Sequence, residues 1–500
     1  MEARKVILDL ILSNHQRDCL TCTRNGNCEL QTLAMKFNVM TVEYEGEKSV
    51  HKIDDLSPSI VRDFNKCILC RRCISTCKKV QEIGAIDCIN RGFNSCVSTV
   101  GNRSLNDVNC TFCGQCIEAC PVGALREKDS TDLVWEKLKD EDTIVIAQTA
   151  PAVRVALGEE FGMKIGTNVK GKMITALQKI GFDKVFDTNT GADVTIVEEA
   201  NEFVERMQKG ETLPMITSCS PGWVRFIEMN YPELLKHLSS CKSPHEMFGA
   251  LIKTYYAEKE KIDPKKIFVV SVMPCVAKKF ERAREEMKNN ELDNVDAVIT
   301  TRELARMIKQ ANIDFANLED SEFDSPMGDA TGAAAIFGTT GGVMEAALRT
   351  AYETITGEEL KNLDFEAVRG EKGIKKATVS IAGKDIKVVV ANGLSNARKI
   401  LDEIKAGKAD YQFVEIMACP GGCIMGGGQP IVDSKKRLDY DVRKLRAEAL
   451  YNIDKESKIR KSHENPVVIK MYKDYLGDVG GHRAHKLLHT HYTKREKYKL

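Results

Sequence analysis

Residues 415–430 read EIMACPGGCIMGGGQP and form the most distinctive stretch of the chain. Cys419 and Cys423 lie four positions apart, with two glycines between them and three more after them. The largely apolar run at 413–417 leads into this stretch and predicts a buried strand. Because glycine lets the backbone approach a bulky group closely, a strand that ends in such a turn can hold two thiolates against an inorganic cluster.

Length and composition bound the class of protein. The chain has 500 residues, so two or more domains are expected. Basic and acidic residues nearly cancel to a net charge of +1, which gives no bulk charge for nucleic acid or a membrane surface. No apolar run is as long as a membrane span, and no signal peptide is predicted. The 18 cysteines therefore indicate metal ligation in a reducing, cytoplasmic compartment rather than disulfides.

The cysteines are concentrated at the start of the chain, with 13 before position 121 and five after it. The stretch 128–142 is highly charged and predicts a surface helix or linker between a metal-rich module and a larger domain. The first ligand group has the spacing H-x3-C-x2-C-x5-C and could close around a zinc ion or an iron–sulfur cluster. Its members are His15, Cys19, Cys22 and Cys28.

Two further groups repeat the pattern C-x2-C-x2-C-x3-C, the ligand run of bacterial ferredoxins with two 4Fe–4S clusters. In that run the fourth cysteine binds the other cluster, so each half of the repeat needs the other half. Two zinc sites are the alternative, but zinc motifs rarely use three cysteines at this spacing. Neighbouring clusters pass single electrons. A further iron–sulfur cluster is therefore favoured over zinc at the His15 ligand group. The predicted ligand sets are Cys67, Cys70, Cys73 and Cys120, and Cys110, Cys113, Cys116 and Cys77.

After the charged stretch, apolar strands alternate with amphipathic helical stretches, which favours an α/β domain with mainly parallel sheets flanked by helices. Helices are predicted at 193–208 and 342–354 and a hairpin at 376–391. Ligands in such folds bind beyond the carboxyl ends of strands, where four cysteines are expected to meet. The strands are predicted at 143–150, 213–216, 267–273, 297–300 and 413–417, and the cysteines are Cys219, Cys275, Cys419 and Cys423.

Three motifs and the cysteine groups together resemble those of iron-only (FeFe) hydrogenases, in the multi-cluster form without the amino-terminal 2Fe–2S domain. The motifs are TSCSPGW at 217–223, MPCVAKKFE at 273–281 and the stretch at 415–430. The resemblance implies reversible hydrogen production and oxidation, 2H⁺ + 2e⁻ ⇌ H₂. It also implies a two-lobed catalytic domain at 143–500 and an α+β bacterial-ferredoxin-like domain at 46–128. A small 4Fe–4S cluster segment, with one histidine and three cysteines as ligands, would occupy 1–45.

The resemblance further implies the cofactors: three accessory 4Fe–4S clusters and the H-cluster, a 4Fe–4S cubane joined to a diiron unit with CO, cyanide and azadithiolate. Cys275, Cys419 and Cys423 would ligate the cubane, with Cys423 as the bridge to the diiron unit. Lys278 would pair with a cyanide, as suits an ammonium beside a bound anion. Five further residues would line the cofactor, although without the resemblance they are ordinary core positions: Ala150, Pro151, Met273, Phe337 and Met417.

A proton relay follows from the same resemblance and comprises Cys219, Glu199, Ser239, Glu202 and Arg206. Cys219 would exchange a proton with the azadithiolate amine. Glu199 and Glu202 lie three positions apart on a predicted helix and share a face. Buried carboxyl groups with a raised pKa can carry protons near neutral pH. Without the resemblance, a solvated helix face is the simpler interpretation.

The first motif departs from the family pattern, which reads TSCCPGW and has a cubane ligand at the position of Ser220. A serine hydroxyl is a hard ligand and a poor acid, whereas this iron site favours soft thiolate. Ser220 could still bind iron, Cys219 could ligate instead at the expense of the relay, or the change could impair the site. A sensory or iron–sulfur assembly protein is therefore the alternative function. A second departure is His245, where glutamine is expected.

The implied partners are ferredoxin or another low-potential electron carrier and the maturation proteins that supply the diiron unit. Subunits of an electron-bifurcating complex are an alternative partner class. Neither nucleic acid nor a membrane span is expected. The basic stretch at 481–500 could attract an acidic ferredoxin, but a solvated basic terminus is the simpler interpretation.

Overall fold

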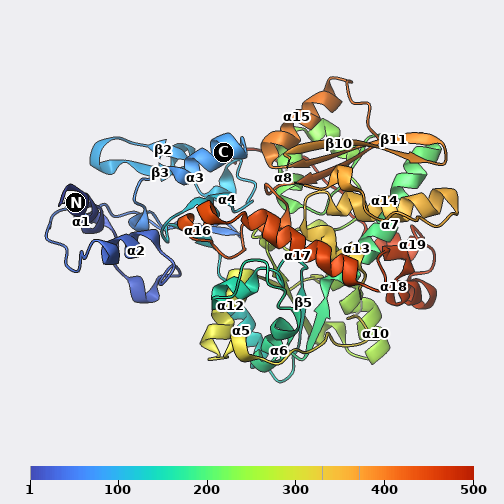
Figure 1. Cartoon of the computed structure of the whole chain (residues 1–500), viewed down its shortest axis with the longest axis horizontal. Helices are drawn as coiled ribbons and strands as arrows, with labels where there is room; N and C mark the ends of the chain where they lie inside the picture. Colours follow the sequence, from blue (N-terminus) through green and yellow to red (C-terminus); the bar gives the residue numbers. More distant parts are fainter. Residues whose placement is uncertain (1, 329, 371, 500) are drawn as a thin grey trace. The chain divides into compact units, whose positions relative to one another are not determined.

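The computed structural model describes residues 2–328, 330–370 and 372–499. It divides the chain into two compact units. Unit 1 is Met1–Lys128 with Ile431–Tyr440 and Glu496–Leu500, and unit 2 is Asp129–Pro430 with Asp441–Arg495. The elements can be followed in Figure 1, where the colour runs along the sequence from blue to red. Across the described ranges, no helix is long and apolar enough to cross a membrane.

The backbone of unit 1 repeats as its sequence does. Leu69 and Phe112, at the same place in the two ligand runs, have φ values of 54° and 57°. Each donates its backbone N–H to the sulfur two residues earlier, Cys67 Sγ or Cys110 Sγ, at 3.4 Å. A short helix follows in each half. These helices are α3 (Arg72–Ser75), continued by a π-helical turn at Thr76–Val80, and α4 (Gln115–Ala119).

Two small antiparallel pairs and two helices complete unit 1. The stretch from Arg24 to Glu29 packs on the ferredoxin-like repeat. Arg24 Nη1 donates to the Cys120 carbonyl at 3.3 Å, and the Glu29 N–H donates to the Pro121 carbonyl at 3.0 Å. The helices are α1 (Glu2–Asn14) and α2 (Glu29–Lys36). The pairs are β1 (Ile60–Arg62) with β4 (Leu125–Glu127) and β2 (Asp87–Ile89) with β3 (Cys96–Ser98).

Unit 2 contains two four-stranded sheets. The first has the order β6-β5-β8-β9 and is entirely parallel. The second has the order β10-β11-β12-β7 and is parallel except for the β10–β11 hairpin. The strands of the first sheet are β5 (Ile144–Thr149), β6 (Lys184–Asp187), β8 (Ile267–Met273) and β9 (Ala297–Thr300). Those of the second are β7 (Met215–Ile216), β10 (Ile374–Ile381), β11 (Lys384–Asn392) and β12 (Phe413–Met417).

This architecture confirms the predicted α/β class. β9 and β12 are buried at every residue, which requires cover on both faces of their sheets. The strand predicted at 213–216 is shorter than expected, because Pro214 has no N–H to donate to the ladder. The main covering helices are α6 (Lys170–Ile180), α7 (Thr188–Lys209), α8 (Pro221–Asn230), α9 (Pro244–Leu251), α12 (Thr301–Gln310), α14 (Gly342–Thr356), α15 (Leu394–Lys405) and α17 (Val442–Glu456).

For one stretch the structure decides between the predicted alternatives, a surface helix and a linker, and one helix starts earlier than predicted. The stretch 128–142 contains α5 (Thr131–Leu138), and Val134 is fully buried in the core of unit 2, so this stretch is not a linker. α7 begins five residues before the predicted start at 193. The cause is Asp187, whose carboxylate accepts the Asn189 N–H at 3.0 Å and caps the helix ahead of its first apolar residues.

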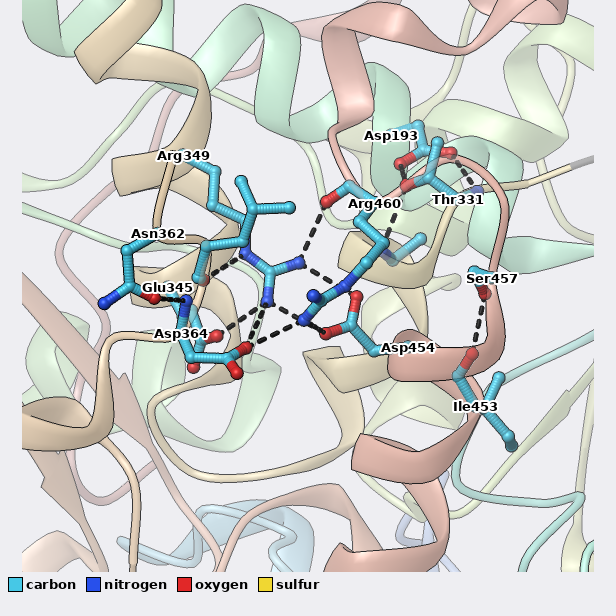
Figure 2. Close-up of polar contacts among 12 residues, drawn as sticks. Asp193, Thr331, Glu345, Arg349, Asn362, Asp364, Ile453, Asp454, Ser457 and Arg460 are labelled. Atoms are coloured by element: carbon cyan, nitrogen blue, oxygen red, sulfur yellow. Dashed lines mark hydrogen bonds and ion pairs between the residues drawn. The ribbon is translucent and has the colours of Figure 1, made fainter. Parts of the chain in front are cut away.

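Buried charges fix α14 to its surroundings. At its start, the Glu415 carboxylate of β12 accepts the N–H groups of Gly341 and Met344, each at 2.7 Å. One turn further, Arg349 is fully buried between Glu345 at 2.7 Å and Asp454 at 2.9 Å, as Figure 2 shows. Because Arg349 and its two carboxylate partners are of opposite sign, these ion pairs tie α14 to α17.

Candidate functional site

Four cysteines of unit 2 follow strands of two different sheets. Cys275 follows β8 of the first sheet, whereas Cys219 follows β7 and Cys419 and Cys423 follow β12 of the second. Burial raises the pKa of the Cys423 thiol to about 12, and the neighbouring Cys275 raises it further. Burial also raises the pKa of Cys219, with Glu199 and then Cys423 as the next causes. Cys423 is therefore a neighbour of both Cys275 and Cys219.

Backbone contacts hold the glycine-rich turn against the loop that carries Cys275. Gly422 has a φ of +91°, a conformation that L side chains rarely adopt. A Cβ on Gly426 would lie 2.2 Å from the Pro274 carbonyl oxygen, so no other residue fits there. The same carbonyl accepts the Gly428 N–H at 2.8 Å. These contacts set the spacing between the two cysteine loops.

Ser220 lies at the same place in the fold. It is the residue that precedes α8, and its Oγ accepts the N–H of Ala418 at 3.2 Å, directly before Cys419. Besides Cys219, the three motifs thus offer three thiols, Cys275, Cys419 and Cys423, and the hydroxyl of Ser220 as ligands. Soft thiolates suit the iron of an iron–sulfur cluster, so the donor set fits such a group at three of its four positions.

Lys278 belongs to a buried polar group beside these loops. Its Nζ donates to Glu281 Oε2 at 2.8 Å, to Ser243 Oγ at 2.9 Å and to the Cys219 carbonyl at 3.5 Å. Burial is the largest single effect and opposes its charge, but Glu281, with Cys275 and Cys219, keeps the pKa of Lys278 raised. The ammonium is therefore fixed in place and charged, which suits an anionic ligand.

His245 supports Glu281 from the other side. Burial, followed by Lys278, lowers the pKa of His245 to about 4, so the ring is neutral at pH 7. His245 Nε2 lies 2.7 Å from Glu281 Oε2 and Nδ1 lies 3.2 Å from Ser271 Oγ. A neutral ring satisfies both contacts when Nε2–H donates to the carboxylate and Nδ1 accepts from the hydroxyl. This arrangement orients the carboxylate that holds Lys278.

The proposed relay residues lie along one face of α7 and the segment beside β7. Glu199 is buried, and its pKa is raised to about 8 by burial and then by Glu202. Ser239 lies beside Glu199 and donates to Glu202 Oε2 at 3.0 Å, and Arg206 Nη2 donates to Glu202 Oε1 at 2.5 Å. Glu199 Oε2 is buried and has no hydrogen-bond partner within the described ranges. The solvated-face interpretation is therefore wrong for Glu199.

The predicted lining residues are all buried but fall into two groups. Phe337, which lies just before α14, and Met417 belong to an apolar cluster against which Cys219 and Cys423 pack. The other three belong to the side of the first sheet. Ala150 and Pro151 follow β5, and Met273 is the last residue of β8.

The cysteines of unit 1 form two groups of neighbours. Burial raises the pKa of Cys73 to about 12, and its next causes are Cys120, Cys67 and Cys70. For the other group, burial raises the pKa of the Cys116 thiol well above its ordinary value. The causes that follow burial are Cys113, Cys110, Cys77 and Cys73. These neighbours fit the crossed ligand sets, which remain a prediction.

His15 offers an unused ring nitrogen. Its Nδ1 is buried and lacks a hydrogen-bond partner among the residues that the structure describes. Burial, followed by Lys66, lowers the pKa of His15 and favours the neutral ring that a metal needs. The Cys22 sulfur lies close to Gly123, where an added Cβ would be 2.8 Å from it. Cys19 and Cys28 are free thiols in the same segment.

The carboxyl-terminal stretch corrects one expectation. Residues 482–495 are not a solvated basic terminus, because α19 (His482–Leu488) packs into unit 2 and His489 forms an antiparallel bridge with Cys241. Thr490 N–H donates to the Ser240 carbonyl at 2.8 Å. The sequence signal was the apolar trio Ala484, Leu487 and Leu488, which recurs at helical spacing within the basic residues.

Four family models match the chain. "Iron only hydrogenase large subunit, C-terminal domain" matches 143–427, and "Iron hydrogenase small subunit" matches 440–495. "NADH-ubiquinone oxidoreductase-G iron-sulfur binding region" matches 4–43, and "NADH-quinone oxidoreductase subunit 3, ferredoxin-like domain" matches 57–126. The first of these alone covers more than half of the chain.

Whole-chain relatives agree with the family models. "NADP-reducing hydrogenase subunit HndD" of Solidesulfovibrio fructosivorans is 51% identical over 99% of this chain and 85% of its own length. "Iron hydrogenase 1" of Clostridium pasteurianum is 46% identical over 99% of this chain and 86% of its own length. A solved structure of an apo FeFe hydrogenase from Chlamydomonas reinhardtii has a TM-score of 0.65 and 42% identity, and the match covers 73% of this chain and 99% of that one.

Proposed function

The chain belongs to the iron-only (FeFe) hydrogenase family, and from that premise we propose which of its residues carry the reaction 2H⁺ + 2e⁻ ⇌ H₂. The observation that carries the proposal is the meeting of three motifs at one place. Cys275, Cys419 and Cys423 arrive from two sheets, and Ser220 bonds to the backbone beside Cys419. These three thiols would hold the H-cluster cubane, with Cys423 as the bridging sulfur and Ser220 at the fourth position.

When bound, the H-cluster supplies the redox chemistry that joins two protons and two electrons, and the accessory clusters supply one-electron transfer. The protein orients and shields this group. Lys278, fixed by Glu281 and Ser243, presents a charged ammonium to an anionic ligand such as cyanide. Phe337 and Met417 pack beside the thiols and exclude water from them.

Protons would travel inward from Glu202. The Ser239 hydroxyl, which donates to Glu202 Oε2, would first turn its proton toward Glu199; it then accepts a proton from Glu202 Oε2 and hands its own to Glu199. Because the pKa of Glu199 is raised to about 8, this carboxyl is mainly protonated at pH 7 and can deliver a proton. Its Oε2, which bonds to none of the described residues, is the atom left for exchange with the Cys219 thiol. Arg206 holds Glu202 Oε1 and so keeps Oε2 directed at Ser239.

Cys219 is better placed for the relay than for ligation. Its thiol interacts first with Glu199, whereas the Ser220 hydroxyl lies at the backbone N–H before Cys419. We therefore assign the relay to Cys219 and the fourth cubane position to Ser220. This assignment keeps every relay member in use despite the departure from the family motif.

Unit 1 would carry electrons through three 4Fe–4S clusters. The buried Nδ1 of His15, which bonds to no residue in the described part of the chain, supports a cluster rather than a structural role for that ring. The ligand sets are His15, Cys19, Cys22 and Cys28; Cys67, Cys70, Cys73 and Cys120; and Cys110, Cys113, Cys116 and Cys77.

The electron partner would be ferredoxin or another low-potential carrier, in a reducing cytoplasmic compartment. HndD is by its name a subunit of an NADP-reducing hydrogenase. We propose that this chain likewise works beside partner subunits and that maturation proteins supply its diiron unit. Copurification of stoichiometric partners with the tagged chain from its native cell would test this, and a chain isolated alone with full ferredoxin-linked activity would contradict it.

The active site is tested on matured protein. We expect hydrogen evolution with reduced viologen, hydrogen uptake with oxidised viologen, and infrared bands of metal-bound CO and cyanide. Those bands without turnover would indicate an impaired hydrogenase. Iron–sulfur clusters without those bands would instead support the sensory or assembly alternative.

A further inference from the structure

Three side chains able to bind a metal ion face one another where the proposed relay reaches Glu202. The ligand atoms of Glu202, Cys241 and His489 all lie within 4.8 Å of one another. They come from α7, from the segment beside β7 and from the residue after α19. Cys241 and His489 stand opposite each other in a β-bridge, so the backbone fixes two of the three.

The spacing is near that of a tetrahedral zinc site. Cys241 Sγ lies 3.9 Å from Glu202 Oε2. Bound to zinc, such donors would be about 3.3–3.6 Å apart, so shifts of about 1 Å or less would close the site. The Ser240 hydroxyl now bridges Glu202 Oε2 at 3.2 Å and His489 Nδ1 at 2.7 Å. A cation between the carboxylate and the ring would take over both of those contacts.

A buried carboxylate already prepares His489 as a ligand. His489 Nε2 lies 3.0 Å from Glu198 Oε2, and Glu198 is itself held by the Tyr472 hydroxyl and the Gly480 N–H. With Nε2–H donated to this carboxylate, Nδ1 is left to bind a metal. Such a carboxylate–histidine pair is the usual support of a zinc-bound imidazole. This contact is independent of the triad itself.

The charges and the access to the site also suit a dication. The Cys241 thiolate and the Glu202 carboxylate would balance the two charges of zinc, and the Glu198 carboxylate would offset Arg206. Burial raises the pKa of Cys241 well above its ordinary value, and Glu202 raises it further, so zinc must displace a proton to bind. The Glu202 side chain is 15% exposed, which gives the ion a way in.

We propose that Glu202, Cys241 and His489 form a zinc-binding site and that zinc bound there closes the proton relay. The second half rests on the proposed function, because Glu202 Oε2 is the atom that accepts from Ser239. The first half does not depend on it. The reaction is thereby open to control by a divalent cation at a point away from the cofactor.

The test uses the matured full chain, Cys241→Ala and the matched variant Cys88→Ala, which removes a cysteine outside every proposed ligand set. Each protein is incubated with Zn²⁺ and desalted, and its zinc and iron contents are measured. Zinc K-edge absorption then reports the ligands. The rate of hydrogen evolution is measured before zinc is added, after it is added, and again after a chelator removes it. Each protein is compared with its own zinc-free rate.

We expect the parent and Cys88→Ala to retain about one more zinc per chain than Cys241→Ala, with one sulfur ligand and the rest nitrogen or oxygen. Zinc should slow the parent about tenfold or more, reversibly, since a blocked proton donor costs at least that much. Equal zinc contents in the parent and in Cys241→Ala would contradict the proposed zinc site. Zinc that is gained only as iron is lost would contradict it as well. If zinc binds through Cys241 but the rate of hydrogen evolution does not change, zinc does not close the relay and the relay does not run through Glu202. An inactive parent that still binds zinc through Cys241 would contradict the proposed function alone.

Discussion

The cluster sites of unit 1 and the cysteine loops of unit 2 bring their proposed cluster ligands together in different ways. In unit 1 the proposed ligands recur at fixed short spacings, and Leu69 and Phe112 repeat the same backbone geometry toward the first sulfur of each run. In unit 2 the ligands come from loops some 200 residues apart that meet only because two sheets are assembled. Each run of unit 1 supplies three of the four ligands of a set and takes only the fourth from the other run, whereas the dispersed site depends on the scaffold for every loop that carries a ligand.

The largest expected effect separates the two regions directly. Cys423→Ala should abolish hydrogen turnover and the CO and cyanide infrared bands, because the bridging sulfur is lost. Cys70→Ala, in unit 1, should lower ferredoxin-linked evolution but leave those bands in place. Infrared spectra and assays with two electron donors measure both. Loss of the bands in Cys70→Ala would show that the two regions are not assembled independently.

The relay comes next. Glu199→Gln keeps the shape of the side chain but cannot release a proton, so hydrogen evolution should fall about 10²- to 10⁴-fold. The matched control is Glu205→Gln on the same helix, where the carboxylate pairs with Lys209 at the surface. Steady-state rates of the two variants are compared at equal iron content. Similar rates would remove Glu199 from the relay.

Dependence on the scaffold can be tested far from any cysteine. Arg349→Met leaves Glu345 with Arg369 and Asp454 with Arg460 as the remaining guanidinium partners, so the loss of the fully buried cation between them should cost up to about 3–5 kcal/mol of unfolding free energy. Breaking the exposed Glu205–Lys209 pair with Lys209→Met should have a much smaller effect, because solvent screens a surface ion pair. Denaturant unfolding followed by circular dichroism measures both. Equal effects would mean that the buried network does not support unit 2.

Ser220→Cys should have a smaller effect, because it changes one ligand and not the loop around it. A soft thiolate in place of the hydroxyl should slow the loss of cubane iron to a chelator several-fold. Iron release and hydrogen evolution are followed together. An unchanged rate of iron loss would mean that residue 220 does not ligate the cubane.

The smallest expected effect is on the pH profile. Because the pKa of Glu199 is raised to about 8, its acid form predominates below that pH and is lost above it. Hydrogen evolution should therefore decline as the pH rises through about 8. Glu199→Gln should lack this alkaline limb. A limb that persists in the variant would assign it to another group.

Much of the dispersed site could be predicted because its motifs are local even though the site is not. The strands at 267–273, 297–300 and 413–417 match the structure residue for residue, since buried strands leave continuous apolar runs. Which strands pair is a long-range property, so the sequence did not show that Cys275 and Cys423 come from different sheets.

Other features were hidden for physical reasons. The early start of α7 depends on a single cap, Asp187, followed by polar residues that carry no helical period. The role of His489 depends on contacts with Ser240 and Glu198. These residues lie 249 and 291 positions earlier in the chain. Periodicity and spacing report neighbours along the chain, and they are silent about such partners.

The contact between Gly426 and Pro274 also bears on how the site can vary in evolution. The glycine-rich turn is held to the Pro274 carbonyl by backbone atoms alone, through the bare Cα of Gly426 and the N–H of Gly428. The spacing of the loops therefore does not depend on which side chain each loop presents to the cofactor. The ligands that these two loops carry can therefore change in a lineage while the loops keep their places, because backbone atoms alone set the spacing between them.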